Sequence, residues 1–252
     1  MNILAPLRDK LVLSAAGANF MTGLVGNVSI PTYDGSTVGW AGEVDAAADG
    51  AGTFGEVELS PKRLTAYVDI SKQFLIQDSV SAEALLRKDI VDAISNKLEA
   101  TILGAEAGST TKPAGLFNAV VADEADITYK DIVAMEQKLE EANVSGNITF
   151  IASPYAKATL KTTAISGTKS DVRMLMDSGE VDGYPVLVTN GMAKKGLILG
   201  NFNDLVIGQW GGIDLTVDPY TQAANGKIRL VVNAYFDAKP QRAASFVKKV
   251  LK

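Results

Sequence analysis

Two periodic patterns follow each other in the first half of the chain. Apolar and polar residues alternate from residue 64 to residue 71, which is typical of a half-buried β-strand. From residue 82 onward, apolar residues instead recur at every fourth position, namely at Leu86, Ile90, Ile94, Leu98 and Ile102. This spacing places them on one face of an α-helix that lies on a sheet. The pattern therefore predicts a strand followed by a long amphipathic helix.

The ends of this helix carry residues that favour helix termini. Ser81 is a candidate N-cap, and Gly104 stands where a residue in the left-handed conformation often closes a helix. A helix from residue 82 to residue 103 is roughly 33 Å long, at about 1.5 Å per residue. Because this is long for a small domain, we expect it to be a spine along which the rest of the chain packs.

The first 63 residues offer little material for a core. Residues 1–30 show no sustained period, which predicts either a frayed terminus or an arm that becomes ordered on a neighbour. Residues 30–63 are rich in glycine, with strands predicted at 38–44 and 53–59 around an Asp49-Gly50 turn. A two-stranded ribbon is only marginally stable alone. We therefore expect this ribbon to project and pack on another subunit; the alternative is a mobile surface hairpin.

The second half of the chain alternates short helices and short strands. Thr128, with Asp131 three residues later, predicts a capped helix to about residue 142, and Ser153-Pro154 predicts a second helix through residue 160. Strands are predicted at residues 148–152, 184–188, 197–199, 205–207, 213–217 and 227–238. The lysines near the end are interpreted as a solvated basic tail. These elements predict an α+β fold.

The composition disfavours several kinds of chemistry. The 252 residues, 47% hydrophobic and 21% charged, are typical of a globular protein. Cysteine and histidine are both absent, which removes thiolate nucleophiles, Ser-His-Asp triads and zinc sites with sulfur or imidazole ligands. We therefore expect no enzyme activity, catalytic residue, metal site or cofactor. The net charge of −5 disfavours general electrostatic binding of nucleic acid. No apolar run is long enough to span a membrane.

One motif matches a nucleotide-binding pattern and has to be weighed. Residues 50–55 read G-x-G-x-x-G. In a dinucleotide site this loop follows a buried strand and opens a helix, whose N-terminus holds the pyrophosphate. Here an acidic stretch precedes the glycines and alternating strand residues follow them. We therefore expect no cofactor to bind at this loop.

Several short motifs follow one another in a characteristic order. After the arm and the glycine-rich ribbon come the runs Glu56-Val57-Glu58-Leu59-Ser60-Pro61, Pro113-Ala114-Gly115-Leu116, Ser153-Pro154, Asp182-Gly183-Tyr184-Pro185 and Leu199-Gly200-Asn201-Phe202. In this order, and over nearly the whole chain, they resemble the tailed-bacteriophage major capsid protein family of the HK97 fold. No single motif is specific for the family, but the ordered set is.

The resemblance implies a division of the chain into five parts. An N-terminal arm takes residues 1–30, and an extended β-hairpin loop that reaches over a neighbouring subunit takes residues 31–70. A peripheral domain contains the spine helix within residues 71–118 and terminal strands within residues 213–252. An axial domain takes residues 119–212.

The ribbon and the resemblance together give a set of expected inter-subunit contacts. They are Trp40, Glu43, Phe54, Glu56, Lys62, Arg63, Tyr220, Asn225 and Arg242. Some family members also crosslink their subunits covalently. The crosslink is an isopeptide bond between a ribbon lysine and a neighbour's asparagine, with a glutamate as base. Here no lysine lies between Lys10 and Lys62, and Leu230 or a near neighbour stands where the glutamate is expected. We therefore expect no crosslink.

The resemblance implies a major capsid protein that self-assembles into an icosahedral shell enclosing the phage genome, through noncovalent contacts. Expected partners are its own copies in hexamers and pentamers, portal, scaffold or protease and decoration proteins, and packaged double-stranded DNA bound non-specifically, with no membrane. A scaffold segment would have been removed before Met1, or the scaffold is a separate protein. The expected location is the virion capsid, after assembly in the host cytoplasm. The alternative is an encapsulin-like nanocompartment shell protein enclosing a cargo enzyme.

Overall fold

The computed structural model describes residues 11–33, 35–44, 46, 49–73, 79–118, 126–166 and 173–252. Its helices are α2 (Val12–Ala15), α4 (Ser79–Ile102), α5 (Tyr129–Glu141) and α6 (Pro154–Thr162), with 3-10 turns η1 (Phe202–Asp204), η2 (Ala223–Asn225) and η3 (Ala243–Ser245). Its strands are β1 (Asn19–Met21), β2 (Val28–Tyr33), β3 (Phe54–Leu59), β4 (Lys62–Ser71), β5 (Ile148–Ala152), β6 (Glu180–Val181), β7 (Tyr184–Val188), β8 (Gly196–Asn201), β9 (Leu205–Asp218), β10 (Lys227–Pro240) and β11 (Phe246–Val250).

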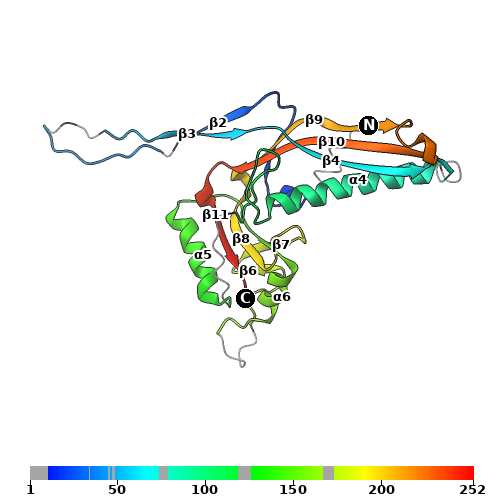
Figure 1. Ribbon diagram of the computed structural model, residues 1–252. Helices are drawn as coiled ribbons and strands as arrows, with labels where there is room; N and C mark the ends of the chain where they lie inside the picture. The colour runs from blue at the N-terminus through cyan, green and yellow to red at the C-terminus, as the bar shows by residue number, and fades with distance from the viewer. Residues whose placement is uncertain are drawn as a thin grey trace.

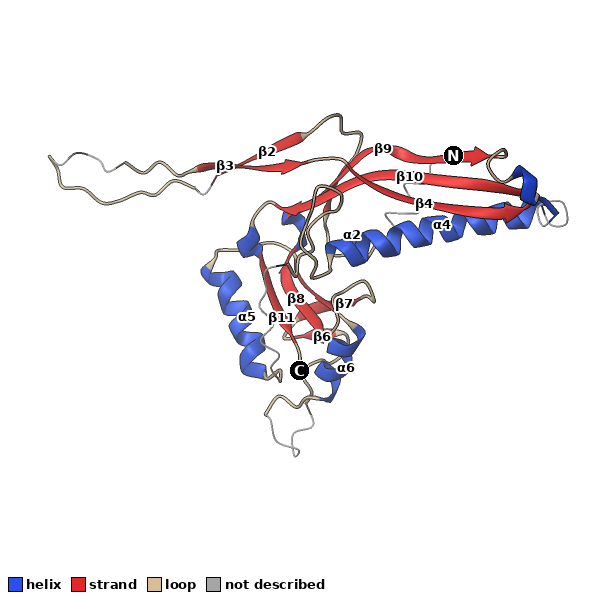
Figure 2. Cartoon of the chain, in the orientation of Figure 1, coloured by secondary structure: helices blue, strands red, loops and turns tan. Residues whose placement is uncertain are grey.

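Two sheets, each with its own helices, form the body, and a ribbon projects from it (Figure 1). The first sheet has the strand order β1-β9-β10-β4, and α4 runs along one of its faces. The second has the order β11-β8-β5-β7-β6 and is flanked by α5 and α6 (Figure 2). β2 and β3 pair with each other in the ribbon. The predicted α+β class is confirmed.

The two longest strands, β9 and β10, hold the four-stranded sheet together. β10 pairs antiparallel with β4 from Lys227 opposite Ser71 to Phe236 opposite Lys62. β9 pairs with the other edge of β10, with one irregularity in register. The prediction of two separate strands at residues 205–207 and 213–217 is wrong, because β9 is a single strand of 14 residues. The glycines between the two apolar runs bend the strand without ending it.

The spine helix is confirmed as α4, a helix of 24 residues. Ile90, Ile94, Leu98 and Ile102 are buried, as their spacing predicts. The side chain of Leu86 lies outside the described part of the chain. The predicted N-cap is wrong, because the helix begins at Ser79 and Ser81 lies within its first turn.

The end of the spine helix is also built differently from the prediction. Gly104 does not have a positive φ, so it is not a left-handed cap. Instead, a Cβ at Gly104 would lie 2.6 Å from the carbonyl oxygen of Ala100, and a Cβ at Gly115 would lie 2.0 Å from the carbonyl oxygen of Gly104. Glycine is needed here because two backbone segments pass in contact, not because the helix reverses.

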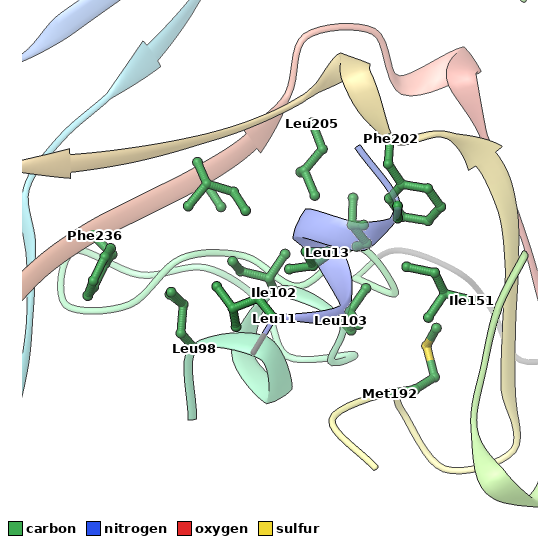
Figure 3. Close-up of a cluster of buried hydrophobic side chains, with 14 of the residues drawn as sticks. Leu11, Leu13, Leu98, Ile102, Leu103, Ile151, Met192, Phe202, Leu205 and Phe236 are labelled. Carbon is green, nitrogen blue, oxygen red and sulfur yellow. The ribbon is translucent and has the colours of Figure 1, made fainter. Parts of the chain in front are cut away.

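The start of the described chain belongs to the core of the body. Leu11 and Leu13 are buried against Ile102, Phe202 and Leu205 in the cluster under the four-stranded sheet (Figure 3). The prediction of a frayed terminus, or of an arm ordered on a neighbour, is therefore wrong for residues 11–21, which pack on the body of their own chain. A four-residue helix has too few positions to show a period, so the pattern could not reveal it.

A buried carboxylate joins three segments next to this core. Glu99, on α4, is 6% exposed. It accepts a hydrogen bond from the backbone N–H of Val12 at 2.9 Å and a second from the hydroxyl of Thr189, in the loop after β7. A buried carboxylate requires such donors. Glu99 thus fixes the N-terminal segment and the second sheet to the spine helix.

Helix caps position the second sheet as the sequence predicts. Thr128 and Asp131 form a reciprocal capping box at the start of α5, and Ser153 caps α6, with Pro154 in the first turn. The interpretation of the last lysines as a solvated tail is wrong for Lys248 and Lys249. These two lie in β11, which pairs with β8, and Lys249 forms an ion pair with Asp131 at 2.5 Å, whereas Lys252 is exposed.

Candidate inter-subunit surfaces

The ribbon projects from the body (Figure 1), and it carries large apolar side chains that are exposed to solvent. Trp40 is fully exposed, and Val38, Val44 and Phe54 are 98%, 95% and 83% exposed. The Phe54 ring touches another ring, that of Tyr33, with a centroid separation of 4.6 Å. Several large exposed apolar side chains on one projecting segment mark a site of contact with another molecule.

The strands of the ribbon differ from the prediction. β3 lies where a strand was predicted, but its partner is β2, with Val28 opposite Leu59 and Tyr33 opposite Phe54. Residues 38–44 were predicted as the partner strand, and this is wrong because they form no strand. Residues 50–55 lead into β3 and not into a helix, so they lack the context of a dinucleotide site.

Beyond the paired strands, a small number of polar contacts hold the two sides of the ribbon together. The Thr37 N–H donates to the carbonyl oxygen of Gly50 at 2.9 Å, and a Cβ at Gly50 would lie 1.9 Å from the carbonyl oxygen of Thr37. The Tyr33 hydroxyl lies 2.6 Å from that of Ser36 and accepts from the Gly52 N–H, and these hydrogen bonds lower the pKa of Tyr33. The glycines thus allow the two sides to approach closely where no core is present.

The base of the ribbon is fixed to the body by a buried ion pair. Asp237, on β10, is 1% exposed, and its carboxylate lies 2.6 Å from the ammonium of Lys62, whose side chain is 9% exposed. The same carboxylate accepts from the backbone N–H groups of Ser60 and Ala238, each at 3.0 Å. Asp237 therefore fixes the point at which the ribbon leaves the four-stranded sheet.

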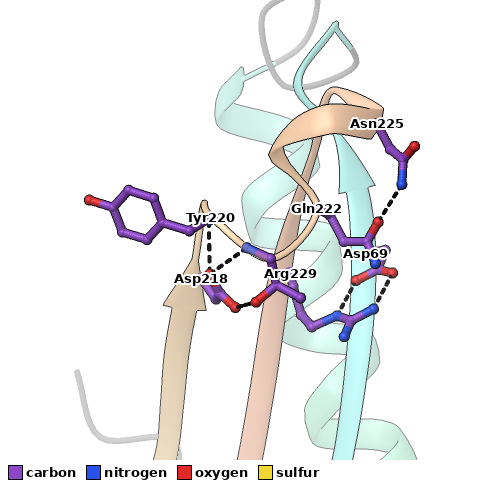
Figure 4. A network of polar contacts seen from close by, with 7 residues as sticks. Asp69, Asp218, Tyr220, Gln222, Asn225 and Arg229 are labelled. Carbon is purple, nitrogen blue, oxygen red and sulfur yellow. Dashed lines mark hydrogen bonds and ion pairs between the residues drawn. The ribbon is translucent and has the colours of Figure 1, made fainter.

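Another exposed aromatic residue lies at the far end of the long strands. Tyr220 is 85% exposed, and its ring points away from the tip (Figure 4). The turn that carries it is ordered by Asp218, which accepts from the N–H groups of Tyr220 and Thr221 at 2.8 and 3.1 Å and from the Thr221 hydroxyl. The tip thus presents an aromatic side chain on a fixed turn.

The strands below this tip are clamped by Arg229. Its guanidinium donates twice to the Asp69 carboxylate, at 2.7 and 2.8 Å, and lies 4.3 Å from the ring centroid of Tyr67. Such a planar double hydrogen bond is stronger than a single neutral one. The hydrogen bond from Arg229 lowers the pKa of Asp69, and the hydrogen bond from the Thr221 side chain lowers that of Asp218.

These shifts predict how the tip responds to acid. Both carboxyl groups have a pKa below their usual 3.8 in the folded chain. The stability they contribute is therefore fully present above about pH 4 and is lost as the pH falls through the lowered pKa values. We expect NMR titration of the carboxyl carbons to give midpoints below 3.8. Thr221→Val should move the midpoint of Asp218 back up; a midpoint at or above 3.8 for Asp218 in the unchanged protein would contradict this assignment.

The expected contact residues occupy four places. Trp40, Glu43, Phe54 and Glu56 lie exposed on the ribbon, Lys62 and Arg63 at its base, Tyr220 and Asn225 at the strand tip, and Arg242 at the turn after β10. Arg242 donates to the carbonyl oxygen of Ala142 and lines a groove of about 960 Å³ beside the ribbon. Lys62 faces Asp237 and not solvent.

Several notable residues were not among those expected from the sequence. Glu99 and Asp237 are buried carboxylates whose partners come from distant parts of the chain, so no local pattern could indicate them. Tyr67 and Val217 are more than half exposed on the four-stranded sheet. The sequence could have indicated the exposure of Tyr67, since this residue falls on the polar side of the alternating pattern of β4.

The described residues also bear on metal sites and on membrane-spanning helices. Across these ranges, no three side chains of histidine, cysteine, aspartate or glutamate come together as metal ligands would. Among the helices seen in the described residues, none combines the length and the apolar character needed to cross a membrane.

The arrangement of a spine helix on a sheet, a second α/β body and a projecting ribbon is the fold of phage capsid subunits. The capsid of a native GTA particle superposes with a TM-score of 0.74 and 16% identity, covering 92% of this chain and 88% of that one. The capsid fold is also matched by a chain from Microbacterium phage Oxtober96, with a TM-score of 0.74 and 12% identity, over 96% of this chain and 91% of that one. The predicted HK97-like fold is confirmed.

The chain belongs to the phage capsid family, whose model matches residues 1–251. It is similar to the major capsid protein of Halomonas phage phiHAP-1, with 28% identity over 95% of this chain and 40% of the relative. It is also similar to the major capsid protein of Klebsiella oxytoca phage phiKO2, with 25% identity over 82% of this chain and 53% of the relative. The chain thus spans about half the length of these relatives, or less.

Proposed function

We propose that this chain is a major capsid protein that self-assembles into the icosahedral shell around a phage genome. The observation that carries the proposal is the ribbon, which holds Trp40 and Phe54 in solvent far from any core of its own chain. Exposing them is unfavourable unless another molecule covers them. Membership of the phage capsid family makes a neighbouring copy the natural cover. The role is structural and not enzymatic.

We further propose that the chain divides as the resemblance implies. Residues 1–30 form the arm, of which residues 11–21 pack on the body of their own chain. Residues 31–70 form the extended loop, residues 71–118 and 213–252 the peripheral domain, and residues 119–212 the axial domain. The pairing of β11 with β8 favours one amendment, in which residues 246–250 return to the axial domain.

The contact residues fit three kinds of junction in such a shell. The ribbon, with Trp40, Glu43, Phe54 and Glu56, lies over a neighbouring subunit. Tyr220 and Asn225, at the strand tip, meet other subunits where several peripheral domains converge. Arg63 and Arg242 lie near the ribbon base, whereas Lys62 stabilises the base from within its own chain.

Further partners follow from a role in the virion. Copies of this chain in hexamers and pentamers would make the shell, with portal, scaffold or protease and decoration proteins as other components and packaged double-stranded DNA bound non-specifically. Assembly would take place in the host cytoplasm. The net charge of −5 fits a wall that does not hold the genome tightly.

Negative-stain electron microscopy of the purified chain tests the proposal. We expect closed particles of uniform diameter, together with subunits or capsomers. Small oligomers at every concentration tested would overturn it. Particles that form inside a host with a docked cargo enzyme, and no DNA, would favour the encapsulin-like alternative.

The subunits should separate completely in SDS. The ribbon has no lysine between residues 11 and 61, so it lacks the nucleophile of an isopeptide bond, and Lys62 is engaged by Asp237. Boiling assembled particles in SDS should therefore return one band at the mass of a single chain, 26.5 kDa. A ladder of covalent oligomers would show that the shell is crosslinked after all.

A further inference from the structure

The charges of this protein are segregated along the chain. Residues 11–61 contain six carboxylates and neither lysine nor arginine. The six are Asp34, Glu43, Asp45, Asp49, Glu56 and Glu58. The rest of the chain therefore holds all 24 basic side chains and 23 of the 29 carboxylates, a net charge of +1. Since the whole chain carries a net charge of −5, residues 11–61 account for all of its net negative charge.

A group of basic side chains faces a small cavity at the base of the ribbon. Lys62, Arg63, Lys97 and Lys112 line a space of about 100 Å³. Its floor is formed by the apolar side chains of Leu64, Leu98, Pro113 and Phe236, and Glu106 also lines it. We call this site the cationic pocket. Its elements are β4, β10, the second half of α4 and the loop after it.

Two of these four charges are already neutralised. Lys62 pairs with Asp237, and Lys112 pairs with Glu106. Within the described ranges, neither Arg63 nor Lys97 forms a side-chain ion pair. The pocket therefore keeps two positive charges beside an apolar floor. Its ideal occupant carries a carboxylate next to an exposed apolar side chain.

The tip of the ribbon has this combination. Glu43 is exposed, and it lies between Trp40 and Val44, which are also exposed. The tip cannot reach the pocket of its own chain, because the ribbon extends away from the body (Figure 1). At about 3.3 Å per residue, the extended ribbon holds Glu43 tens of ångströms from its base. An occupant of the pocket with this chemistry has to come from a second copy.

We propose that the cationic pocket of one subunit receives the acidic ribbon tip of a second copy, with Glu43 facing Arg63 and Lys97. This inference rests on the proposed shell function and specifies its main contact. Opposite charges at such a site fix the register of the ribbon and steer its approach. Trp40, which is fully exposed beside Glu43, then supplies contact that does not depend on salt.

Charge reversal of each side, followed by their combination, tests the pairing. Glu43→Arg alone, and Arg63→Glu alone, should each reduce the yield of particles at least tenfold at low salt, measured by sedimentation and electron microscopy. The double variant Glu43→Arg/Arg63→Glu should restore most of the yield, because the pair is re-formed with opposite sign. Lys130→Glu, an equal charge change at the exposed start of α5, serves as the matched control and should leave assembly unchanged.

Salt gives a second readout. Raising the ionic strength from 0.1 M to 1 M shortens the screening length from about 10 Å to about 3 Å. The difference in yield between the unchanged protein and the single variants should therefore shrink at high salt. Lys97→Glu repeats the test on the spine helix. Because the Lys97 side chain is exposed, we expect this substitution to leave the fold unchanged.

The outcomes separate this inference from the proposed function. If the unchanged protein forms no particles, the shell function fails. If particles form and the single variants match the unchanged protein, or if the double variant is no better than either single one, the pocket is not the ribbon's partner. Loss of DNA binding in Arg63→Glu, with assembly intact, would likewise overturn the inference and assign the pocket to nucleic acid.

Discussion

Asp237→Ala is expected to lower the free energy of unfolding of the subunit by about 3–5 kcal/mol, the usual cost of removing one partner of a buried ion pair. The substitution leaves the Lys62 ammonium almost buried with no counter-charge, and it removes the acceptor for the N–H of Ser60. In a chain of this size the loss corresponds to about 6–20 °C in Tm. Thermal unfolding of unassembled subunits at low protein concentration measures it.

A double-mutant cycle distinguishes the pair from simple loss of packing. Lys62→Met alone should also destabilise, because Asp237 would then be a buried charge without its partner. Lys62→Met combined with Asp237→Leu should cost less than the two single changes added together, since no charge remains buried. Lys112→Ala, at the exposed pair with Glu106, is the matched control and should change stability by less than about 1 kcal/mol. Strict additivity in the cycle would show that the two side chains do not interact.

This pair also shows where sequence reasoning reaches its limit. The stripe from Ile90 to Ile102, the capping box of α5 and the Ser153 cap of α6 were predictable, because their determinants lie within four residues of one another. Lys62 and Asp237 are 175 positions apart, and neither has a local pattern that marks it. Only the pairing of β10 with β4 brings them together.

The errors in the ribbon have a different cause. Residues 38–44 have a strand-like composition, but composition does not choose a partner. β3 pairs with β2, which lies closer to the body, and the described residues between them, toward the projecting tip, form no regular strand. The composition nevertheless indicated that the ribbon needs a partner. A segment with so few large apolar residues cannot bury them against one another, so another molecule has to cover them.

The same reasoning explains the acidic ribbon and the basic pocket. Both were present in the sequence as residue types, yet only the fold shows that Arg63 and Lys97 face one cavity. Their contribution to specificity complements that of the apolar contacts: charges select the register of a neighbour, whereas burial of apolar surface supplies most of the affinity. Removing the apolar anchor should therefore have the larger effect on whether shells form.

Trp40→Ala is expected to abolish efficient assembly while leaving the subunit folded. The side chain is fully exposed in the single chain, so its removal takes no contact away from the body and should not change Tm. A buried tryptophan at the centre of an interface contributes about 2 kcal/mol or more, which is a factor of about 30 in affinity. Because each subunit presents one ribbon, the protein concentration needed for particle formation should rise about 30-fold, as measured by sedimentation across a concentration series.

Two further variants make this result decisive. Trp40→Phe keeps an aromatic anchor and should retain most of the assembly, whereas deletion of residues 45–52 should prevent it and still give a folded subunit by circular dichroism. The deletion removes Gly50 and with it the hydrogen bond from Thr37 that closes the tip, so the ribbon could no longer present Trp40 in its present geometry. Shells of Trp40→Ala at the concentration that suffices for the unchanged protein would mean that the ribbon is not the contact on which the capsid depends.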